Sequence, residues 1–131
     1  MAELEPGIVG RDVAGMERFY TEAMGFVVTA RIQFDAFGTV LRLARGDGGL
    51  KLYFPGDAAL DPPRDDDPWY RAGGYRYAAL NLDAPAAVDA LVDSMQAAGG
   101  TVLLEPHEHR PGARMALVTD PEGNPWEILF G

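Results

Sequence analysis

The sequence contains no cysteine, only two histidines and no long apolar run. Without cysteine the chain can form no disulfide, no thiolate nucleophile and no cysteine-based zinc site. His107 and His109 are the only histidines. The sequence shows no Ser-His-Asp or Cys-His arrangement that would indicate a nucleophilic hydrolase. No segment approaches the roughly 20 apolar residues that a membrane-spanning helix needs, so we expect no membrane partner.

Basic residues are also scarce, because 11 Lys and Arg residues stand against 20 Asp and Glu residues, for a net charge of −9. This balance argues against a nucleic-acid partner, since phosphates require patches of Lys and Arg. It is compatible with a cationic ligand, although solubility alone would also explain it. The first residues, MAELEPGIVG, lack the basic start and apolar stretch of a signal peptide, so we expect a cytoplasmic location.

Length and composition indicate one soluble globular domain over residues 1–131. Hydrophobic residues make up 47% of the chain and charged residues 24%, which are ordinary values for such a domain. A segment rich in Pro, Asp and Gly, residues 55–73, is predicted to be a linker. It separates module one, residues 1–54, from module two, residues 74–131.

Module one combines a helix with strand-like runs. The stretch EPGIVG predicts a short strand, and the helix that follows is capped by Asp12 and ended by Gly25. The pattern after the helix predicts three more strands, over residues 26–34, 39–44 and 50–54.

Module two repeats this order. YRYAALNL predicts a strand, and Pro85 opens a helix with Asp83 or Ala84 before it. Gly99 and Gly100 end that helix, and three strands follow at TVLLEPHEH, ARMALVT and PWEILF. Each module therefore has the order β-α-β-β-β, which places the chain in the α+β class. Because such a unit does not readily bury its apolar face alone, we expect a curled eight-stranded cup with both helices outside.

The last predicted strand carries a carboxylate in an apolar run. Strand alternation places Trp126, Ile128 and Phe130 on one face, and Glu127 and Leu129 on the other. If the second face is solvent, Glu127 is an ordinary surface charge. If that face lines a cavity, Glu127 is a candidate ligand-binding or catalytic group.

Two motifs carry a resemblance to a known family. DVAGMERFYTEAMGF, residues 12–26, and the terminal TDPEGNPWEILF resemble patterns of the vicinal oxygen chelate superfamily. That superfamily includes glyoxalases, extradiol dioxygenases, fosfomycin resistance enzymes and bleomycin resistance proteins. The resemblance covers nearly the whole chain and implies paired modules that curl into a cup, often completed across a dimer, so a homodimer is expected. It does not name an activity, since this fold hosts isomerases, oxygenases, transferases and pure binders.

The resemblance also implies where a metal would bind. The family's ligand positions match Glu5, Lys51, Tyr77 and Glu127, with Glu5 and Tyr77 on the first strands of the two modules. Metal-using members have an acid where this chain has Lys51, and a histidine where it has Tyr77. A cation and a phenol are poor partners for a divalent ion. We therefore expect no resident metal and no other cofactor, with Glu127 paired to Lys51 or Tyr77; if a divalent metal is present, its ligands are Glu5, Tyr77 and Glu127.

Aromatic and basic residues supply further candidates. Trp69, Tyr70, Tyr75 and Tyr77 cluster around the module junction, where they could stack on a flat ligand or pack the linker onto the sheet. The ligand-binding candidates are Glu5, Arg42, Lys51, Tyr53, Trp69, Tyr77 and Glu127. His107 and His109 could form a metal pair on one face of a strand, but their place at a strand end favours the surface, and their role stays open.

The leading functional prediction is a metal-free small-molecule binding protein that resembles the bleomycin resistance branch. Such a protein would sequester a cationic or aromatic compound, for example an antibiotic, without transforming it. The alternative is a metal-dependent lyase, isomerase or dioxygenase of the glyoxalase type. A carboxylate-only mechanism, with Glu127 as a base whose pKa is raised by burial, stays open, as does a purely structural role.

Overall fold

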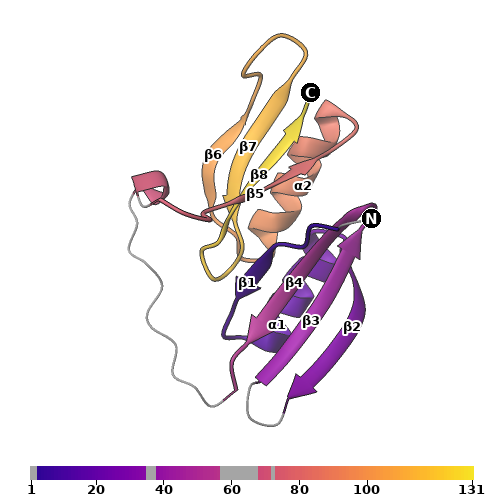
Figure 1. Ribbon diagram of the computed structural model, residues 1–131. Helices are drawn as coiled ribbons and strands as arrows, with labels where there is room; N and C mark the ends of the chain where they lie inside the picture. The colour runs from indigo at the N-terminus through magenta and orange to yellow at the C-terminus, as the bar shows by residue number, and fades with distance from the viewer. Residues whose placement is uncertain (1–2, 35–37, 57–67, 72) are drawn as a thin grey trace. The chain divides into compact units, whose positions relative to one another are not determined.

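The protein divides into two compact units, residues 1–62 and 63–131 (Figure 1). Each unit has its own four-stranded sheet. A computed structural model describes residues 3–34, 38–56, 68–71 and 73–131. Most of the predicted linker lies outside these residues, and the single-domain assignment over 1–131 stays a prediction.

Unit 1 follows the predicted β-α-β-β-β order. Its strands lie in the order β1-β4-β3-β2, with β1 parallel to β4 and the other neighbours antiparallel. The Asp12 side chain accepts a hydrogen bond of 3.0 Å from the Gly15 N–H, which confirms the predicted helix cap. Its elements are β1 (Gly7–Val9), α1 (Val13–Arg18), a π-helix (Phe19–Ala23), β2 (Val27–Phe34), β3 (Gly38–Arg45) and β4 (Gly48–Phe54).

The π-helix is a departure from the single continuous helix that the sequence predicts. Its wide turn is closed by a bond of 3.2 Å from the Met24 N–H to the Phe19 carbonyl, five residues earlier. This turn brings two consecutive aromatic rings, Phe19 and Tyr20, into the core with edge-to-face contact at 5.3 Å. Gly25, at φ 74°, then ends the helix as predicted.

The two faces of the unit 1 sheet differ in burial. Along β3 and β4, alternate residues are fully buried under α1 and the π-helix, while their neighbours are half-buried or exposed. The buried set is Leu41, Leu43, Leu50, Leu52 and Phe54. We call the other side, which the helices do not cover, the open face of unit 1.

Unit 2 has the same topology, with strand order β5-β8-β7-β6 and β5 parallel to β8. This equivalence confirms the repeated module and the α+β class. Pro85 stands at the start of its helix, as predicted. Its elements are a 3-10 turn (Trp69–Arg71), β5 (Ala78–Asn81), α2 (Pro85–Ala97), β6 (Val102–His107), β7 (Arg114–Thr119) and β8 (Pro125–Phe130).

Helix α2 covers one face of the unit 2 sheet and packs on β6, β7 and β8 (Figure 1). The buried residues are Val88, Leu91, Val92 and Met95 on the helix, and Ala116, Val118, Trp126 and Ile128 on the strands. The uncovered side is the open face of unit 2. A joint eight-stranded cup involves both units and stays a prediction. Within the described ranges, no helix is long and apolar enough to span a membrane.

An ion pair ties α2 to its sheet. Arg114 on β7 donates two hydrogen bonds of 2.8 Å, one to each carboxylate oxygen of Asp89 on α2. The Arg114 guanidinium, chiefly through these hydrogen bonds, holds the pKa of Asp89 below the usual range of an aspartate. A carboxylate with a lowered folded-state pKa stabilises the fold above its unfolded pKa, and that contribution is lost as the pH falls through the folded value.

We therefore expect Asp89→Asn to lower the urea midpoint at pH 7. The difference in midpoint between parent and variant should shrink as the pH falls below about 4, near the ordinary pKa of aspartate. Urea unfolding of the parent and the variant between pH 2 and pH 7 measures this. Asp93→Asn, at an exposed position on the same helix, is the control. If both variants show the same pH dependence, the stabilising role of the Asp89 pair is wrong.

Candidate functional site

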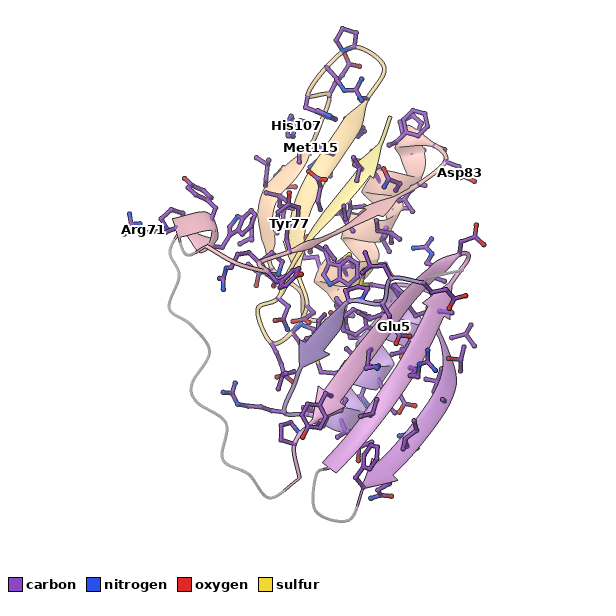
Figure 2. The ribbon with its side chains drawn as sticks, viewed as in Figure 1. Glu5, Arg71, Tyr77, Asp83, His107 and Met115 are labelled. Atoms are coloured by element: carbon purple, nitrogen blue, oxygen red, sulfur yellow. The ribbon has the colours of Figure 1, made fainter. Side chains whose placement is uncertain are left out.

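Four of the predicted ligand-binding residues lie in unit 1: Glu5, Arg42, Lys51 and Tyr53. Arg42 on β3 and Lys51 on β4 are register partners, so their side chains stand next to each other on the open face. Lys51 is in turn paired with Gly7 on β1, two residues after Glu5. The Glu5 side chain lies across Gly49, where an added Cβ would be 3.6 Å from its Oε2 (Glu5 is labelled in Figure 2). The parallel β1–β4 pairing thus places the Glu5 side chain next to Arg42 and Lys51.

Glu5, Arg42 and Lys51 form an ion-pair cluster that we call the Glu5 cluster. Glu5 Oε2 lies 3.2 Å from Arg42 Nε, and Glu5 Oε1 lies 3.5 Å from Lys51 Nζ. The Glu5 side chain is 20% exposed, while those of Arg42 and Lys51 are 48% and 46% exposed. Two cations face one carboxylate, so the cluster carries one net positive charge. Lys51 is also the chain's only lysine.

A row of apolar side chains crosses the same open face next to the Glu5 cluster. It lies two residues before Arg42 on β3 and two residues after Lys51 on β4. Tyr53 on β4 is paired with Val9 on β1 and Val40 on β3, and Val40 is paired with Ile32 on β2. Val9 and Ile32 are exposed, and Tyr53 and Val40 are half-buried. Tyr53 was a predicted site residue; the other three were not, although strand alternation with Arg42 could have indicated them.

In unit 2, Tyr77 and Glu127 share the open face, as the predicted register requires. Tyr77 is 55% exposed and makes an edge-to-face contact at 5.3 Å with Trp69 (Figure 2 labels Tyr77). Glu127 on β8 is half-buried and is paired in register with Ala79 on β5 and Leu117 on β7. The carboxylate therefore lies in a mostly apolar surrounding on the uncovered side of the sheet.

Tyr77 and Lys51 were the predicted partners of the Glu127 carboxylate. Among the described residues of unit 2, the Glu127 side chain has no hydrogen bond or ion pair, so its pairing with Tyr77 is not formed. The ring of Tyr77 contacts Trp69 instead. Lys51 pairs with Glu5 in unit 1; a contact between Lys51 and Glu127 involves both units and stays a prediction.

The remaining aromatic and histidine candidates are peripheral. Tyr75 is fully exposed, while the rings of Tyr70 and Tyr77 each contact the ring of Trp69. Among the described residues, the predicted aromatic cluster thus consists of Trp69, Tyr70 and Tyr77. His107 and His109 have ring centroids 6.2 Å apart at the end of β6 (His107 is labelled in Figure 2). Each contributes an imidazole, but no carboxylate completes a metal site there within the described ranges.

The donor chemistry does not fit the metal centre of the metal-using relatives. Both carboxylate oxygens of Glu5 face cations, and Lys51 stands where the resemblance to the family implies an acidic ligand in metal-using members. Among residues 3–34, 38–56, 68–71 and 73–131, no group of three or more His, Asp or Glu residues could hold a metal ion. These residues therefore do not fit such a metal, and the expected absence of a cofactor stays a prediction.

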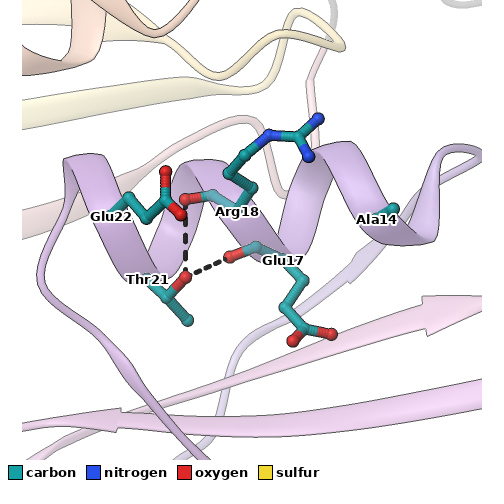
Figure 3. A pocket seen from close by; sticks show the side chains of 5 residues that line it. All are labelled: Ala14, Glu17, Arg18, Thr21 and Glu22. Carbon is teal, nitrogen blue, oxygen red and sulfur yellow. Dashed lines mark hydrogen bonds between the residues drawn. The ribbon is translucent and has the colours of Figure 1, made fainter.

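A separate hollow lies on the surface of α1 and the π-helix (Figure 3). It has a volume of about 270 Å³ and is lined by Ala14, Glu17, Arg18, Thr21 and Glu22. Thr21 Oγ1 donates to the Glu17 carbonyl at 2.8 Å within the helix itself. Since its lining comes from successive turns of one helical segment, and includes none of the predicted site residues, the hollow is a surface groove of that segment.

The sequence profile of the Glyoxalase/Bleomycin resistance protein/Dioxygenase superfamily matches residues 4–128. The chain belongs to this superfamily. The match confirms the resemblance drawn from the two motifs at residues 12–26 and at the C-terminal strand. Membership of the superfamily leaves both the specific activity and the metal status open, since its name alone covers binders and enzymes.

Solved structures of superfamily proteins share the fold. A glyoxylase/bleomycin resistance protein/dioxygenase domain from Frankia sp. has a TM-score of 0.75 at 17% identity, covering 100% of this chain and 92% of that one. A glyoxalase-related enzyme from Fulvimarina pelagi has a TM-score of 0.69 at 22% identity, covering 100% and 89%. A lactoylglutathione lyase from Agrobacterium tumefaciens has a TM-score of 0.68 at 22% identity, covering 99% and 93%. No curated protein matches the sequence.

The partner of Lys51 can be tested by stability. Because the Lys51–Glu5 pair is partly exposed and Arg42 also holds Glu5, Lys51→Met should cost less than about 1 kcal/mol. If Lys51 instead neutralised a buried Glu127, its loss would cost about 3 to 5 kcal/mol. Urea midpoints of Lys51→Met and of Lys51→Met with Glu127→Gln separate the two cases. Rescue of a large loss by the second change would contradict the assignment to Glu5.

Proposed function

We propose that this chain is a metal-free small-molecule binding protein of the bleomycin resistance type, which holds an aromatic compound without transforming it. The Glu5 cluster is the observation that carries this proposal. Two cations lie within 3.5 Å of the carboxylate that would be a metal ligand in a metal-using relative. A divalent cation at Glu5 would be repelled by both of them, or would have to displace them.

The open face of unit 2 supports the binding of a flat ligand. Around Glu127 it presents Leu117 and Leu129, with Met115 on the neighbouring strand and Tyr77 at the end of β5. Apolar and aromatic side chains with a few polar groups are the usual lining of a ligand site. Glu127, without a partner in the described part of its unit, offers an acceptor for a hydrogen-bond donor of such a compound.

The alternative is a metal-dependent lyase, isomerase or dioxygenase, in which Glu5, Tyr77 and Glu127 would be the ligands. It would need a phenol as a ligand and a Glu5 released from Arg42 and Lys51, and metal sites prefer imidazole and carboxylate donors. In such an enzyme the half-buried Glu127 would be a metal ligand. The alternative can therefore be tested by replacing this one residue.

Metal analysis decides between the two. We expect protein purified without chelator to contain far less than one equivalent of Ni, Zn, Fe or Mn. The same protein should be stabilised against heat by some members of a panel of aromatic compounds, and mass spectrometry should recover those compounds unchanged. One equivalent of metal in the parent protein, lost in Glu127→Gln, would overturn the proposal in favour of the enzyme.

We also propose a homodimer. Each sheet ends in a long unpaired edge strand, β2 in unit 1 and β6 in unit 2, and symmetric partners commonly complete such edges. Light scattering should give about twice the chain mass of 14.1 kDa. A mass of one chain at micromolar concentration would contradict this assignment.

A further inference from the structure

The Glu5 cluster has donors to spare on an uncovered sheet face. Two other cations of unit 1 are used elsewhere: Arg31 pairs with Glu17, and Arg45 donates to the Met24 carbonyl at 3.1 Å. Arg42 uses its Nε towards Glu5, and its remaining guanidinium nitrogens make no hydrogen bond within the described residues. A guanidinium has five N–H donors and an ammonium three, so one carboxylate does not saturate them.

The local charge is opposite to that of the chain. The protein carries a net charge of −9, yet this part of the open face carries one net positive charge. A cationic ligand group would meet two repulsive charges and one attractive charge here. An anionic group would meet the reverse, and at a half-exposed site these Coulomb terms decide the preferred sign. The cluster therefore selects for an anion.

The apolar row lies at the right separation for the rest of a ligand. Tyr53 follows Lys51 by two residues and Val40 precedes Arg42 by two, so the two rows are about 6.6 Å apart on the same face. That spacing is close to the length of an aromatic carboxylate from its oxygens to the far edge of the ring. An Arg guanidinium and a carboxylate are both planar and pair through two parallel hydrogen bonds.

We propose that the open face of unit 1 binds an organic carboxylate with a flat apolar body. The carboxylate lies between the Arg42 guanidinium and the Lys51 ammonium, and the body lies on Tyr53, Val40 and Ile32. Glu5 competes with the bound carboxylate for the same two cations and so lowers their attraction for it. The proposal rests on the proposed metal-free binding function and names the charge and class of the ligand.

A matched pair of probes tests the charge. 2-Naphthoate and 2-naphthamide share one ring system and differ in charge, and calorimetry gives both affinities. We expect the naphthoate to bind about tenfold more tightly or better, since hydrogen bonds between charged groups are stronger than those of a neutral amide. This preference should shrink in high salt. Amide shifts in NMR spectra should concentrate on β3 and β4.

Variants of the cluster should change the naphthoate affinity in opposite directions, a result that a purely structural role would not produce. Arg42→Met and Lys51→Met should each weaken the naphthoate about tenfold and leave the naphthamide within about twofold. Glu5→Gln should strengthen the naphthoate, because it removes the competing anion. Arg31→Met, which removes a cation that pairs with Glu17 in the same unit, is the control and should change neither affinity.

The outcomes separate this inference from the function on which it rests. Equal binding of both probes to metal-free protein, or weaker naphthoate binding in Glu5→Gln, overturns the carboxylate assignment and leaves metal-free binding intact. One equivalent of metal, or no binding of any aromatic compound in the panel, overturns the proposed function itself. If neither probe binds and Tyr53→Asp converts a dimer into monomers, a second copy of the chain covers this face, and the inference is wrong.

Discussion

Replacing Asp120 with alanine should destabilise unit 2 by about 3 kcal/mol or more. The Asp120 side chain is 1% exposed and organises the turn before β8. Its Oδ1 accepts hydrogen bonds from the N–H groups of Glu122 at 2.9 Å and Asn124 at 3.0 Å, and its Oδ2 accepts one from Asn124 Nδ2 at 2.8 Å. Alanine would leave these part-buried donors without their acceptor, and each such loss costs about 1 to 3 kcal/mol.

Urea unfolding followed through hydrogen exchange of the β7 and β8 amides measures this effect in the right unit. Asp93→Ala makes the same change at an exposed position of α2 and should stay within about 0.5 kcal/mol of the parent. Asp120→Asn keeps the shape but places one amide group opposite another, so its cost should be intermediate. An Asp120→Ala variant as stable as Asp93→Ala would show that the turn does not depend on this carboxylate.

Two neighbouring residues of β8 should respond very differently to the same substitution. Ile128 is 0% exposed and packs under α2, so Ile128→Ala should cost about 3 kcal/mol through lost burial and the cavity left behind. Glu127 lies on the open face without a partner in the described part of unit 2, so Glu127→Ala should cost less than about 1 kcal/mol.

Denaturant midpoints of the two variants, measured at the same pH, check this contrast. The result depends only on which face each side chain occupies, so it tests the strand register on which the placement of Glu127 rests. Similar costs at both positions would mean that the open face of unit 2 is as tightly packed as its core. Glu127 would then be a structural residue and not a candidate ligand contact.

The sequence by itself determined the elements and their faces, because the signals are local. Asp12, Gly25 and Pro85 mark helix ends through backbone geometry and capping, and all three act as predicted. Alternation along the last strand was enough to separate Trp126 and Ile128 from Glu127, since the side-chain period of a strand is two. The repeated β-α-β-β-β order identified the α+β class, and the two family motifs identified the superfamily.

Only the tertiary structure decided which charges meet. Glu5, Arg42 and Lys51 lie in three separate segments. The parallel β1–β4 pairing and the β3–β4 register bring both cations within 3.5 Å of the Glu5 carboxylate. The family resemblance implied that Lys51 stands in place of an acidic ligand, but the linear sequence did not indicate which carboxylate Lys51 faces. Pairing partners are set by strand order and register, which depend on the packing of the whole sheet against its helix. The π-helix that contains Phe19 and Tyr20 was likewise not predicted from the sequence, and both of its aromatic side chains are buried in the core.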